Sequence, residues 1–377
     1  MAAFSVDDNL RCLVEELREA VGKRDFSPRQ RLELYRLQAQ PGIIPIYLVT
    51  HNWAARLQNA DTQQFLTDFG LHAKGQIESA LLLEHDFIYN AADIFDFEPE
   101  ALGADLTFLD TGAMPSLTHL PLAKDRNFHR LKIPNPEIDA RMPALLAMKH
   151  YLQQNLGDIY EFEATGSSPF SLACNLRGYE NFTMDMLMEP DYAHELLDFC
   201  VEVCRVYLNA QLELGLNGVH IADAWAAFPL VDPEICDQFI FPAVARLFQG
   251  LSSKQRRWTG LYGLSKIKNW QAHLEKVVSC GTTELCVYQK DLQSIDIGQL
   301  KSFVEEAGVQ VKLGFFGTNL TPYKPEKATL LLRKWFKRLG TSGGVAVHVS
   351  NVPWHTDTND IKNLVGDIRA LATAIHN

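Results

Sequence analysis

The feature that most constrains the fold of this chain is a regular alternation of short β-like runs with longer helical patterns. Apolar and β-branched runs predict strands at 43–49, near 93–97, and at 159–165, 218–223, 257–263, 284–289, 309–317 and 344–350. Segments with apolar residues three and four apart lie between them and predict helices. About eight strand-then-helix units are typical of a parallel sheet with helices outside it.

The alternation predicts an α/β protein, and the length of 377 residues suits a single-domain closed (β/α)8 TIM barrel. An open doubly wound sheet is the alternative, but the first predicted strand is followed by VTHNWAARL, without a glycine-rich dinucleotide fingerprint. We expect residues 1–40 to form a helical segment packed on the outside of the barrel. Residues 41–377 are expected to form the barrel itself.

Charge and hydropathy exclude several classes of partner. The net charge of −11 disfavours nucleic-acid binding, which requires a basic face. No run of eighteen apolar residues is present, so we expect no membrane span. The acidic, amphipathic start MAAFSVDDNL does not resemble a signal peptide. We therefore expect a cytoplasmic protein with a small-molecule substrate and no nucleic-acid or membrane partner.

Polar side chains gather where the predicted strands end, which is the face on which barrel enzymes place their active sites. Because side chains alternate along a strand, His220 and Asp223 should face opposite sides. By the same rule, at most one of Asp93 and Asp96 should point into the mouth of the barrel. The strand-end candidates are His51, Asn52, Asp93, Asp96, Glu163, Ser168, Asp223, Trp225, Tyr262, Asn319, His348 and Asn351.

Two of these candidates have more than one interpretation. Asp223 ends the run GLNGVHIAD, and it is either a helix cap or loop holder or an acid that lines the mouth. His348 lies within an apolar strand, and it is either a core residue or a base. Glu163, Asp223 and the histidines could together bind a metal, but no spacing specifies such a site.

Several segments carry a family resemblance when they are taken in chain order. They are SPRQRLELYRLQAQPGIIPIYLV, EPEALGADLTF, GSSPFSLACNLRGYENF, LGLNGVHIADAWAAFPLVDPEICDQFIFPAVARL and GFFGTNL. In this order they resemble the uroporphyrinogen decarboxylase superfamily, which includes cobalamin-linked methyltransferases. The resemblance runs over nearly the whole chain, and it implies a (β/α)8 barrel.

The resemblance also implies where the chain departs from the decarboxylases. Their R-Q-A-G-R segment carries two arginines that hold substrate carboxylates, whereas NWAAR keeps only Arg56 and has Asn52 in place of the other. A tyrosine of the third helix corresponds to Asn175, and a final histidine corresponds to Ser350. An amide does not replace a bidentate arginine without loss of charge pairing. Most of the porphyrinogen-binding set is therefore missing.

The methyltransferase branch has a zinc site built from an H-x-C pair and a later cysteine. Leu261, Tyr262 and Ser350 stand near the positions of these ligands. We therefore expect no metal to be bound by that set of positions.

Together, these features predict a corrinoid-linked methyltransferase that acts on a small methylated substrate. Acid–base groups at Asp93, Asp96, Asp223, His51 and His348 would supply the catalysis. No cofactor is expected to bind tightly, and a corrinoid would be carried by a partner protein. A divergent uroporphyrinogen-type decarboxylase and a catalytically inactive binding barrel remain the alternatives, and a homodimer remains open.

Overall fold

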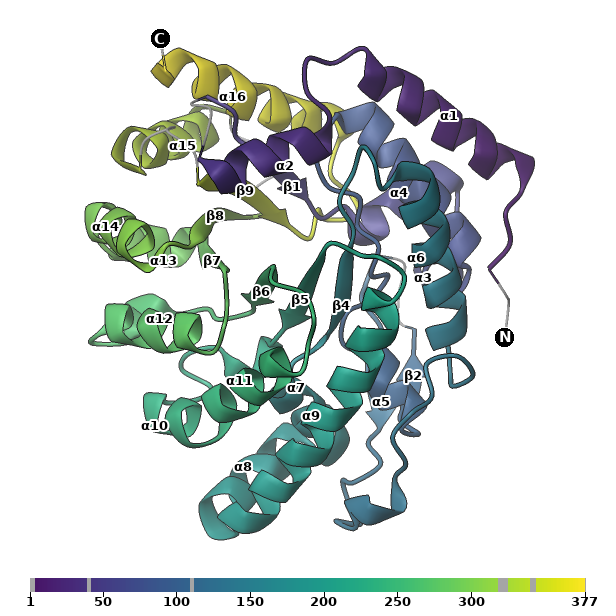
Figure 1. The fold of residues 1–377 in the computed structure, drawn as a ribbon, viewed down its shortest axis with the longest axis vertical. Helices are drawn as coiled ribbons and strands as arrows, with labels where there is room; N and C mark the ends of the chain where they lie inside the picture. Colours follow the sequence, from purple (N-terminus) through teal and green to yellow (C-terminus); the bar gives the residue numbers. More distant parts are fainter. Residues whose placement is uncertain (1–3, 39–41, 109–111, 318–324, 340–343, 377) are drawn as a thin grey trace.

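Seven parallel strands form one curled sheet in the order β1-β9-β8-β7-β6-β5-β4 (Figure 1). The computed structural model describes residues 4–38, 42–108, 112–317, 325–339 and 344–376. The strands are Ile46–Leu48 (β1), Glu163–Ser167 (β4), Gly218–Ala222 (β5), Arg256–Thr259 (β6), Glu284–Tyr288 (β7), Gln310–Phe316 (β8) and Val345–Ser350 (β9). The α/β class and the parallel sheet agree with the prediction from the sequence.

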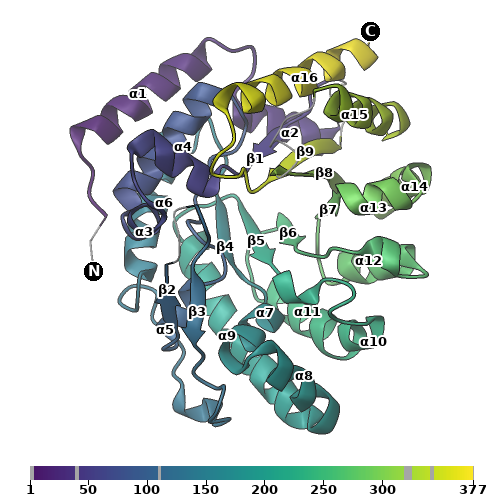
Figure 2. The same cartoon turned by 180° about the vertical axis from the view of Figure 1, so that it is seen from behind.

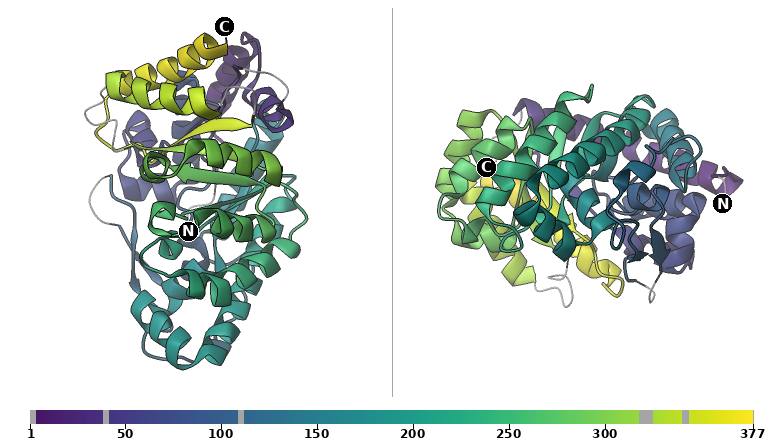
Figure 3. Two further views of the ribbon diagram at one scale, coloured as in Figure 1. Left: turned by 90° about the vertical axis from the view of Figure 1, so that its left-hand side faces the viewer. Right: turned by 90° about the horizontal axis from the view of Figure 1, so that it is seen from below.

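Helices cover the outer face of this sheet, as the side views show (Figure 3). None of the helices in the described part of the chain combines the length and the apolar character needed to cross a bilayer. The α-helices are Asp8–Gly22 (α1), Pro28–Leu37 (α2), Thr62–Thr67 (α3), Phe69–Leu83 (α4), Phe97–Ala101 (α5), Met142–Leu156 (α6), Pro169–Arg177 (α7), Tyr179–Met188 (α8), Pro190–Leu212 (α9), Pro233–Ile235 (α10), Phe241–Gln249 (α11), Trp270–Ser279 (α12), Gln289–Ser294 (α13), Ile297–Ala307 (α14), Pro325–Leu339 (α15) and Thr358–His376 (α16).

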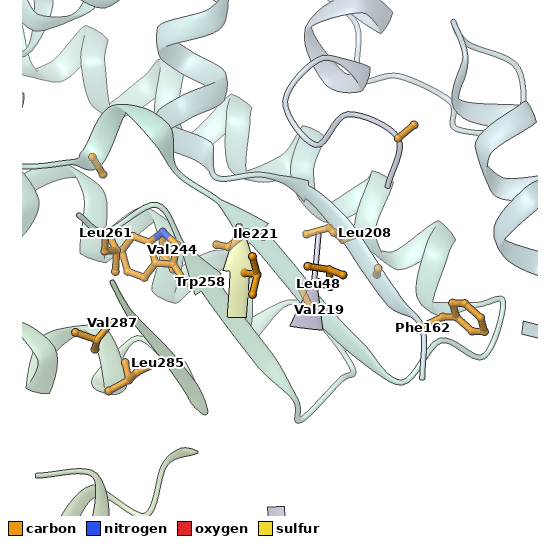
Figure 4. Packing of buried hydrophobic residues seen from close by; sticks show 14 of the residues in the cluster. Leu48, Phe162, Leu208, Val219, Ile221, Val244, Trp258, Leu261, Leu285 and Val287 are labelled. Carbon is orange, nitrogen blue, oxygen red and sulfur yellow. The ribbon is translucent and has the colours of Figure 1, made fainter. Parts of the chain in front are cut away.

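The strands divide their side chains between an apolar outer layer and a polar interior. Val219 and Ile221 of β5 and Trp258 of β6 belong to the hydrophobic cluster beneath the helices (Figure 4). His220 and Arg257 alternate with these residues and are also buried. Because side chains alternate along a strand, His220 and Arg257 face the inside of the curled sheet.

The strand expected near 93–97 is not formed, and this prediction was wrong. Asp96 N donates a hydrogen bond to Asp93 Oδ1 at 3.1 Å, which closes a turn, and α5 begins at Phe97. Among the described residues the main sheet therefore has seven strands rather than the eight of a complete (β/α)8 ladder. A separate antiparallel hairpin of β2 (Asp105–Thr107) and β3 (Ser116–His119) was not predicted, and it lies beside α5 (Figure 2).

An extended segment from Asp86 to Ala91 follows the free edge of β1. Asp86 N donates to Ile46 O at 3.0 Å, and Ile46 N donates to Asp86 Oδ2 at 2.9 Å. Phe87, Tyr89 and Ala91 alternate like strand residues, and they belong to one buried cluster with Tyr47 and Val49. This segment thus occupies the position of a second strand, although only its first residue makes strand-like backbone bonds to β1.

The other edge of the sheet, at β4, is satisfied by side chains. Thr165 N donates to Gln211 Oε1 at 2.9 Å, and Gln211 Nε2 donates to Thr165 O at 2.9 Å. Ser167 N donates to Glu98 Oε1 at 2.9 Å. Buried backbone groups require partners, so these two side chains replace part of a missing ladder.

Glu163, the first residue of β4, is satisfied in the same way. Its carbonyl oxygen accepts from Lys149 Nζ at 3.0 Å and from Asn90 Nδ2 at 3.1 Å. Asn90 belongs to the extended segment, so a side chain rather than a backbone amide joins this segment to β4.

The N-terminal segment contains α1 and α2. Helix α1 packs against α4, whereas α2 lies across the N-terminal ends of the strands. Tyr35 OH donates to Glu284 Oε2 at 3.2 Å, and Gly344 N donates to Tyr35 O at 3.1 Å. Arg36 forms an ion pair with Glu161 just before β4. Helix α2 therefore covers the end of the curled sheet opposite to the predicted mouth.

The side-chain edge of β4 can be tested at Gln211, which is fully buried. Gln211→Leu leaves the amide and carbonyl of Thr165 without partners. We expect the free energy of unfolding to fall by about 2–4 kcal/mol, since each unsatisfied buried group costs roughly 1–3 kcal/mol. Urea denaturation measures the change. The control is Gln154→Leu at an exposed position of α6, which should stay within about 0.5 kcal/mol of the parent. Similar losses in the two variants would contradict this description of the edge.

Candidate active site

A cavity of about 700 Å³ lies at the C-terminal ends of the strands. Eight of the residues predicted from the sequence line it: His51, Asp93, Asp96, Asn175, Trp225, Tyr262, His348 and Asn351. A larger groove of about 890 Å³ lies between α1 and the end of α6, and no strand residue lines it. The predicted residues therefore converge on the cavity at the strand ends.

Asp223 does not line this cavity. Its side chain is fully buried, and Oδ1 accepts a hydrogen bond of 2.6 Å from Ser171 Oγ on α7. Burial raises the pKa of Asp223 to about 6, and the hydrogen bond from Ser171 opposes this shift. His220, three residues earlier, does line the cavity, so the two side chains face opposite sides as the alternation predicts. The expectation that Asp223 lies in the mouth was wrong, and its position favours a structural role.

Four further candidates lie outside the cavity lining. Asn52 donates to Ala113 O at 3.1 Å, and Arg56 donates to Trp354 O at 2.7 Å. Glu163 pairs with Arg257 inside the sheet, and Ser168 caps α7 by accepting from Ser171 N at 3.0 Å. Asn319 lies outside the described residues.

Asp93 and Asp96 both line the cavity, although at most one was expected to do so. The alternation rule does not apply, because these residues form a turn rather than a strand. Asp93 Oδ2 accepts from Arg141 Nη1 at 3.0 Å, and Arg141 Nε also donates to Glu100 Oε2 at 2.7 Å. The guanidinium of Arg141 thus forms ion pairs with both Asp93 and Glu100.

The surroundings of Asp96 favour its neutral form. Its side chain is buried, and no ion pair between it and a cation is found among the described residues. Burial, with the negative charge of Asp93 as the next cause, raises the pKa of Asp96 to about 9. A carboxylic acid that keeps its proton at neutral pH can donate that proton to a group in the cavity.

The cavity histidines are uncharged at neutral pH. Burial lowers the pKa of His51 to about 3, and the pKa of His348 is also well below its usual value, mainly because of burial. The Nδ1 atoms of both rings are buried, without a hydrogen-bond partner among the described residues. Both rings line the cavity, and they place no charge there at neutral pH.

Strained backbone conformations mark the same wall. His51 and Asn351 both have φ of 40°, and they follow the neighbouring strands β1 and β9. Positive φ is uncommon for residues other than glycine, and such conformations collect at functional sites. The strain thus supports assigning function to this end of the sheet.

Aromatic rings form much of the remaining wall. Tyr179 and Trp225 are stacked with ring centroids 5.0 Å apart, and Trp225 Nε1 donates to Asn175 Oδ1 at 3.0 Å. Tyr262 and Tyr288 lie 4.5 Å apart. No lysine or arginine is found among the described residues that line the cavity. The lining is suited to a compact apolar ligand with few polar groups.

Some residues of the site were not predicted from the sequence. Arg141 precedes α6 far from any strand end, so the sequence carries no signal for it. Tyr89 lines the cavity, and the alternation of Phe87, Tyr89 and Ala91 could have indicated it. Thr259 also lines the cavity; it is the last residue of β6, and the predicted strand 257–263 ran past it.

Leu261, Tyr262 and Ser350 stand near the positions at which the methyltransferase branch has its zinc-binding histidine and cysteines. Tyr262 and Ser350 line the cavity. Within the described ranges, no cluster of three or more His, Cys, Asp or Glu side chains is placed to hold a metal ion. The side chains that line the cavity carry hydroxyl, imidazole, carboxyl, amide and thiol groups.

Comparison with known protein families identifies the family of this chain. The family model described as uroporphyrinogen decarboxylase (URO-D) matches residues 29–288, which is more than half of the chain. The chain belongs to the uroporphyrinogen decarboxylase family. The match covers the strands from β1 to β7 and most of the residues that line the cavity.

Individual relatives within the family differ in their named reactions. The uroporphyrinogen decarboxylase of Methylococcus capsulatus is 29% identical over 74% of this chain and 75% of its own length. The methylcobamide:CoM methyltransferase MtaA of Methanosarcina barkeri is 26% identical over 51% of this chain and 54% of its own length. A solved methyltransferase from Methanosarcina mazei has a TM-score of 0.78 at 19% identity, covering 94% of this chain and 100% of its own. At 19% identity, the similarity to this solved structure shows a shared fold alone.

The protonation of Asp96 can be measured directly. We expect carbon-13 NMR of the labelled aspartate carboxyls to show that Asp96 is protonated at pH 7 and titrates near pH 9. Asp93→Asn should lower this pKa, because it removes the neighbouring negative charge. A carboxyl at position 96 that titrates close to pH 4, the ordinary value for aspartate, would rule out a neutral acid at this position.

The structural role of Asp223 predicts a stability change. We expect Ser171→Ala to lower the free energy of unfolding by about 1–3 kcal/mol, because a buried acceptor loses its hydrogen bond. Denaturation at neutral pH provides the measurement. Asp223→Asn should likewise lower stability more than it lowers activity, and loss of activity with full stability would assign Asp223 a catalytic role.

Proposed function

We propose that this protein is a corrinoid-linked methyltransferase that takes a methyl group from a small, uncharged methylated compound. The observation that carries the proposal is the position of Asp96, a carboxyl group that is buried at the wall of the cavity next to Asp93, where burial and the charge of Asp93 raise its pKa. A methyl group leaves oxygen or nitrogen readily only if the departing atom receives a proton. Asp96 is suited to supply that proton near neutral pH.

The chemical step needs one proton and one acceptor for the methyl group. The bond between the methyl carbon and its oxygen or nitrogen breaks, and the bonding electron pair stays on the departing atom. That atom takes the proton of Asp96, whose carboxylate then remains beside Asp93 and Arg141. A corrinoid held by a partner protein would supply the electron pair for the new bond to the methyl carbon.

The dimensions of the cavity fit this division of roles. A space of about 700 Å³ can hold a small substrate, but a whole corrinoid is larger than this space. A corrinoid would therefore be presented at the mouth by a partner protein. The aromatic wall formed by Trp225, Tyr179, Tyr262 and Tyr288 would keep the substrate away from bulk water.

A divergent uroporphyrinogen-type decarboxylase is the second candidate, because the family model and the Methylococcus relative carry that name. Uroporphyrinogen bears several carboxylates, and their burial requires cationic partners. Arg56 is turned away toward Trp354 O and Thr356 O, and the described lining supplies no other arginine or lysine. The MtaA relative shows that a named methyltransferase is also similar to this chain. A catalytically inactive binding barrel is the third candidate.

The deciding experiment incubates the purified protein with cob(I)alamin and a panel of uncharged methyl ethers. We expect the cob(I)alamin absorbance to disappear with at least one donor. Asp96→Asn should lower the rate by about 100-fold or more, the usual contribution of a general acid. The matched control is Asp105→Asn at an exposed position of β2, which should keep the parental rate.

Each other outcome of this experiment favours a different candidate. Turnover of uroporphyrinogen without consumption of cob(I)alamin would favour the decarboxylase. Binding of the panel without turnover in either assay would favour the binding barrel. Equal rates for Asp96→Asn and the parent would remove the proposed acid from the mechanism.

A further inference from the structure

A buried network of charged side chains lies inside the curled sheet, beneath the cavity. Arg257 of β6 forms an ion pair with Glu163 of β4, and its Nε lies 3.7 Å from Glu284 Oε1 of β7. Lys312 of β8 approaches the same Glu284 Oε1 at 2.5 Å. Buried charges are tolerated only when they are paired, so the opposing carboxylates hold Arg257 in place. The proposed methyl transfer uses none of these groups.

His220 connects this network to the cavity. Arg257 Nη2 lies 3.1 Å from His220 Nδ1, and His220 Nε2 lies 2.8 Å from Thr259 Oγ1. A guanidinium can only donate hydrogen bonds, so Nδ1 of His220 has to be the acceptor. The ring is then neutral, and its proton is on Nε2.

The tautomer of His220 determines the role of Thr259. Since Nε2 carries the proton, it donates to Thr259 Oγ1, and this oxygen acts as an acceptor. The hydroxyl proton of Thr259 must therefore point elsewhere, and His220 is the partner found for this hydroxyl within the described part of the chain. Thr259 lines the cavity. An acceptor atom on a ligand in the cavity would satisfy the hydroxyl proton of Thr259.

We propose that Thr259 donates a hydrogen bond to an uncharged acceptor oxygen of the bound ligand, and that Arg257 and His220 are positioning residues that direct it. The proposal rests on the cavity being the substrate site of the proposed function. It adds a specificity-determining residue and a ligand requirement, namely an ether, carbonyl or similar neutral oxygen. The neutral His220 and the paired Arg257 place no free charge beside that oxygen.

The test compares two ligands of nearly equal shape, acetophenone and α-methylstyrene, of which only the first carries an acceptor oxygen. Their dissociation constants are measured on the full chain by NMR titration. We expect Thr259→Val to weaken acetophenone by about 2–10-fold, the usual effect of one neutral hydrogen bond, while leaving α-methylstyrene unchanged. Thr259→Ser keeps the hydroxyl, and it should keep the affinity for acetophenone.

Substitutions of His220 test the positioning role separately. Glutamine offers one acceptor and one donor in place of Nδ1 and Nε2–H, so His220→Gln should preserve the preference for the acceptor ligand. His220→Leu removes both contacts, and it should reduce the preference. Equal changes for the two ligands in Thr259→Val, or no change for either ligand, would overturn the proposal.

A second measurement does not depend on any ligand. Nitrogen-15 NMR of histidine-labelled parent protein should show His220 with a protonated Nε2 and a bare Nδ1. A ring protonated on Nδ1 would overturn the proposal. A parent protein that transfers methyl groups but does not prefer acetophenone to α-methylstyrene would refute this inference alone. A parent protein that prefers acetophenone but transfers no methyl group would refute only the proposed function.

Discussion

The paired hydrogen bonds between Asp86 and Ile46 start an irregular segment on which the rest of the site depends. After this point the chain follows β1 but does not form a ladder, and side chains of Gln211, Glu98 and Lys149 satisfy the edge of β4. Because no regular strand holds residues 92–96, Ala92 can adopt a φ of 55°. The following turn then brings two acids to one wall of the cavity, which a regular strand would have prevented.

The electrostatics of the cavity follow from the placement of Asp93 and Asp96 on the same wall. The single guanidinium of Arg141 contacts both Asp93 and Glu100. Asp96 is left in a dry environment beside a negative charge, and protonation is the favourable response to that environment. Burial and the neighbouring charge of Asp93 are thus enough to keep Asp96 protonated. The neighbouring histidines remain uncharged for the same reason, since burial disfavours the imidazolium.

The alternation of strands and helices predicted the α/β class, the parallel sheet and seven of its strand positions, because buried strands are short apolar and β-branched runs that differ from the helical pattern. Strand ends predicted seven of the cavity residues, because the C-terminal ends of parallel strands converge on one face, and the family resemblance supplied Asn175. A strand was wrongly predicted at 93–97 because DIFDF has strand-like composition, whereas Asp93 uses its carboxylate to close a turn. Asp223 was expected in the mouth, but the alternation places it opposite to His220, and His220 is the one of the two that lines the cavity. Arg141 is brought to Asp93 only by tertiary packing, which no local pattern encodes.

The central claim is that Asp96 acts as a proton donor in methyl transfer. The dependence of the transfer rate on pH tests it most directly, measured between pH 6 and 10 with the donor that consumes cob(I)alamin fastest. The account predicts a rate that is level at neutral pH and falls as the pH passes about 9, where Asp96 loses its proton. In Asp93→Asn the fall should move to lower pH. A rate that rises through this range would show that an ionised base drives the reaction, and it would contradict the account.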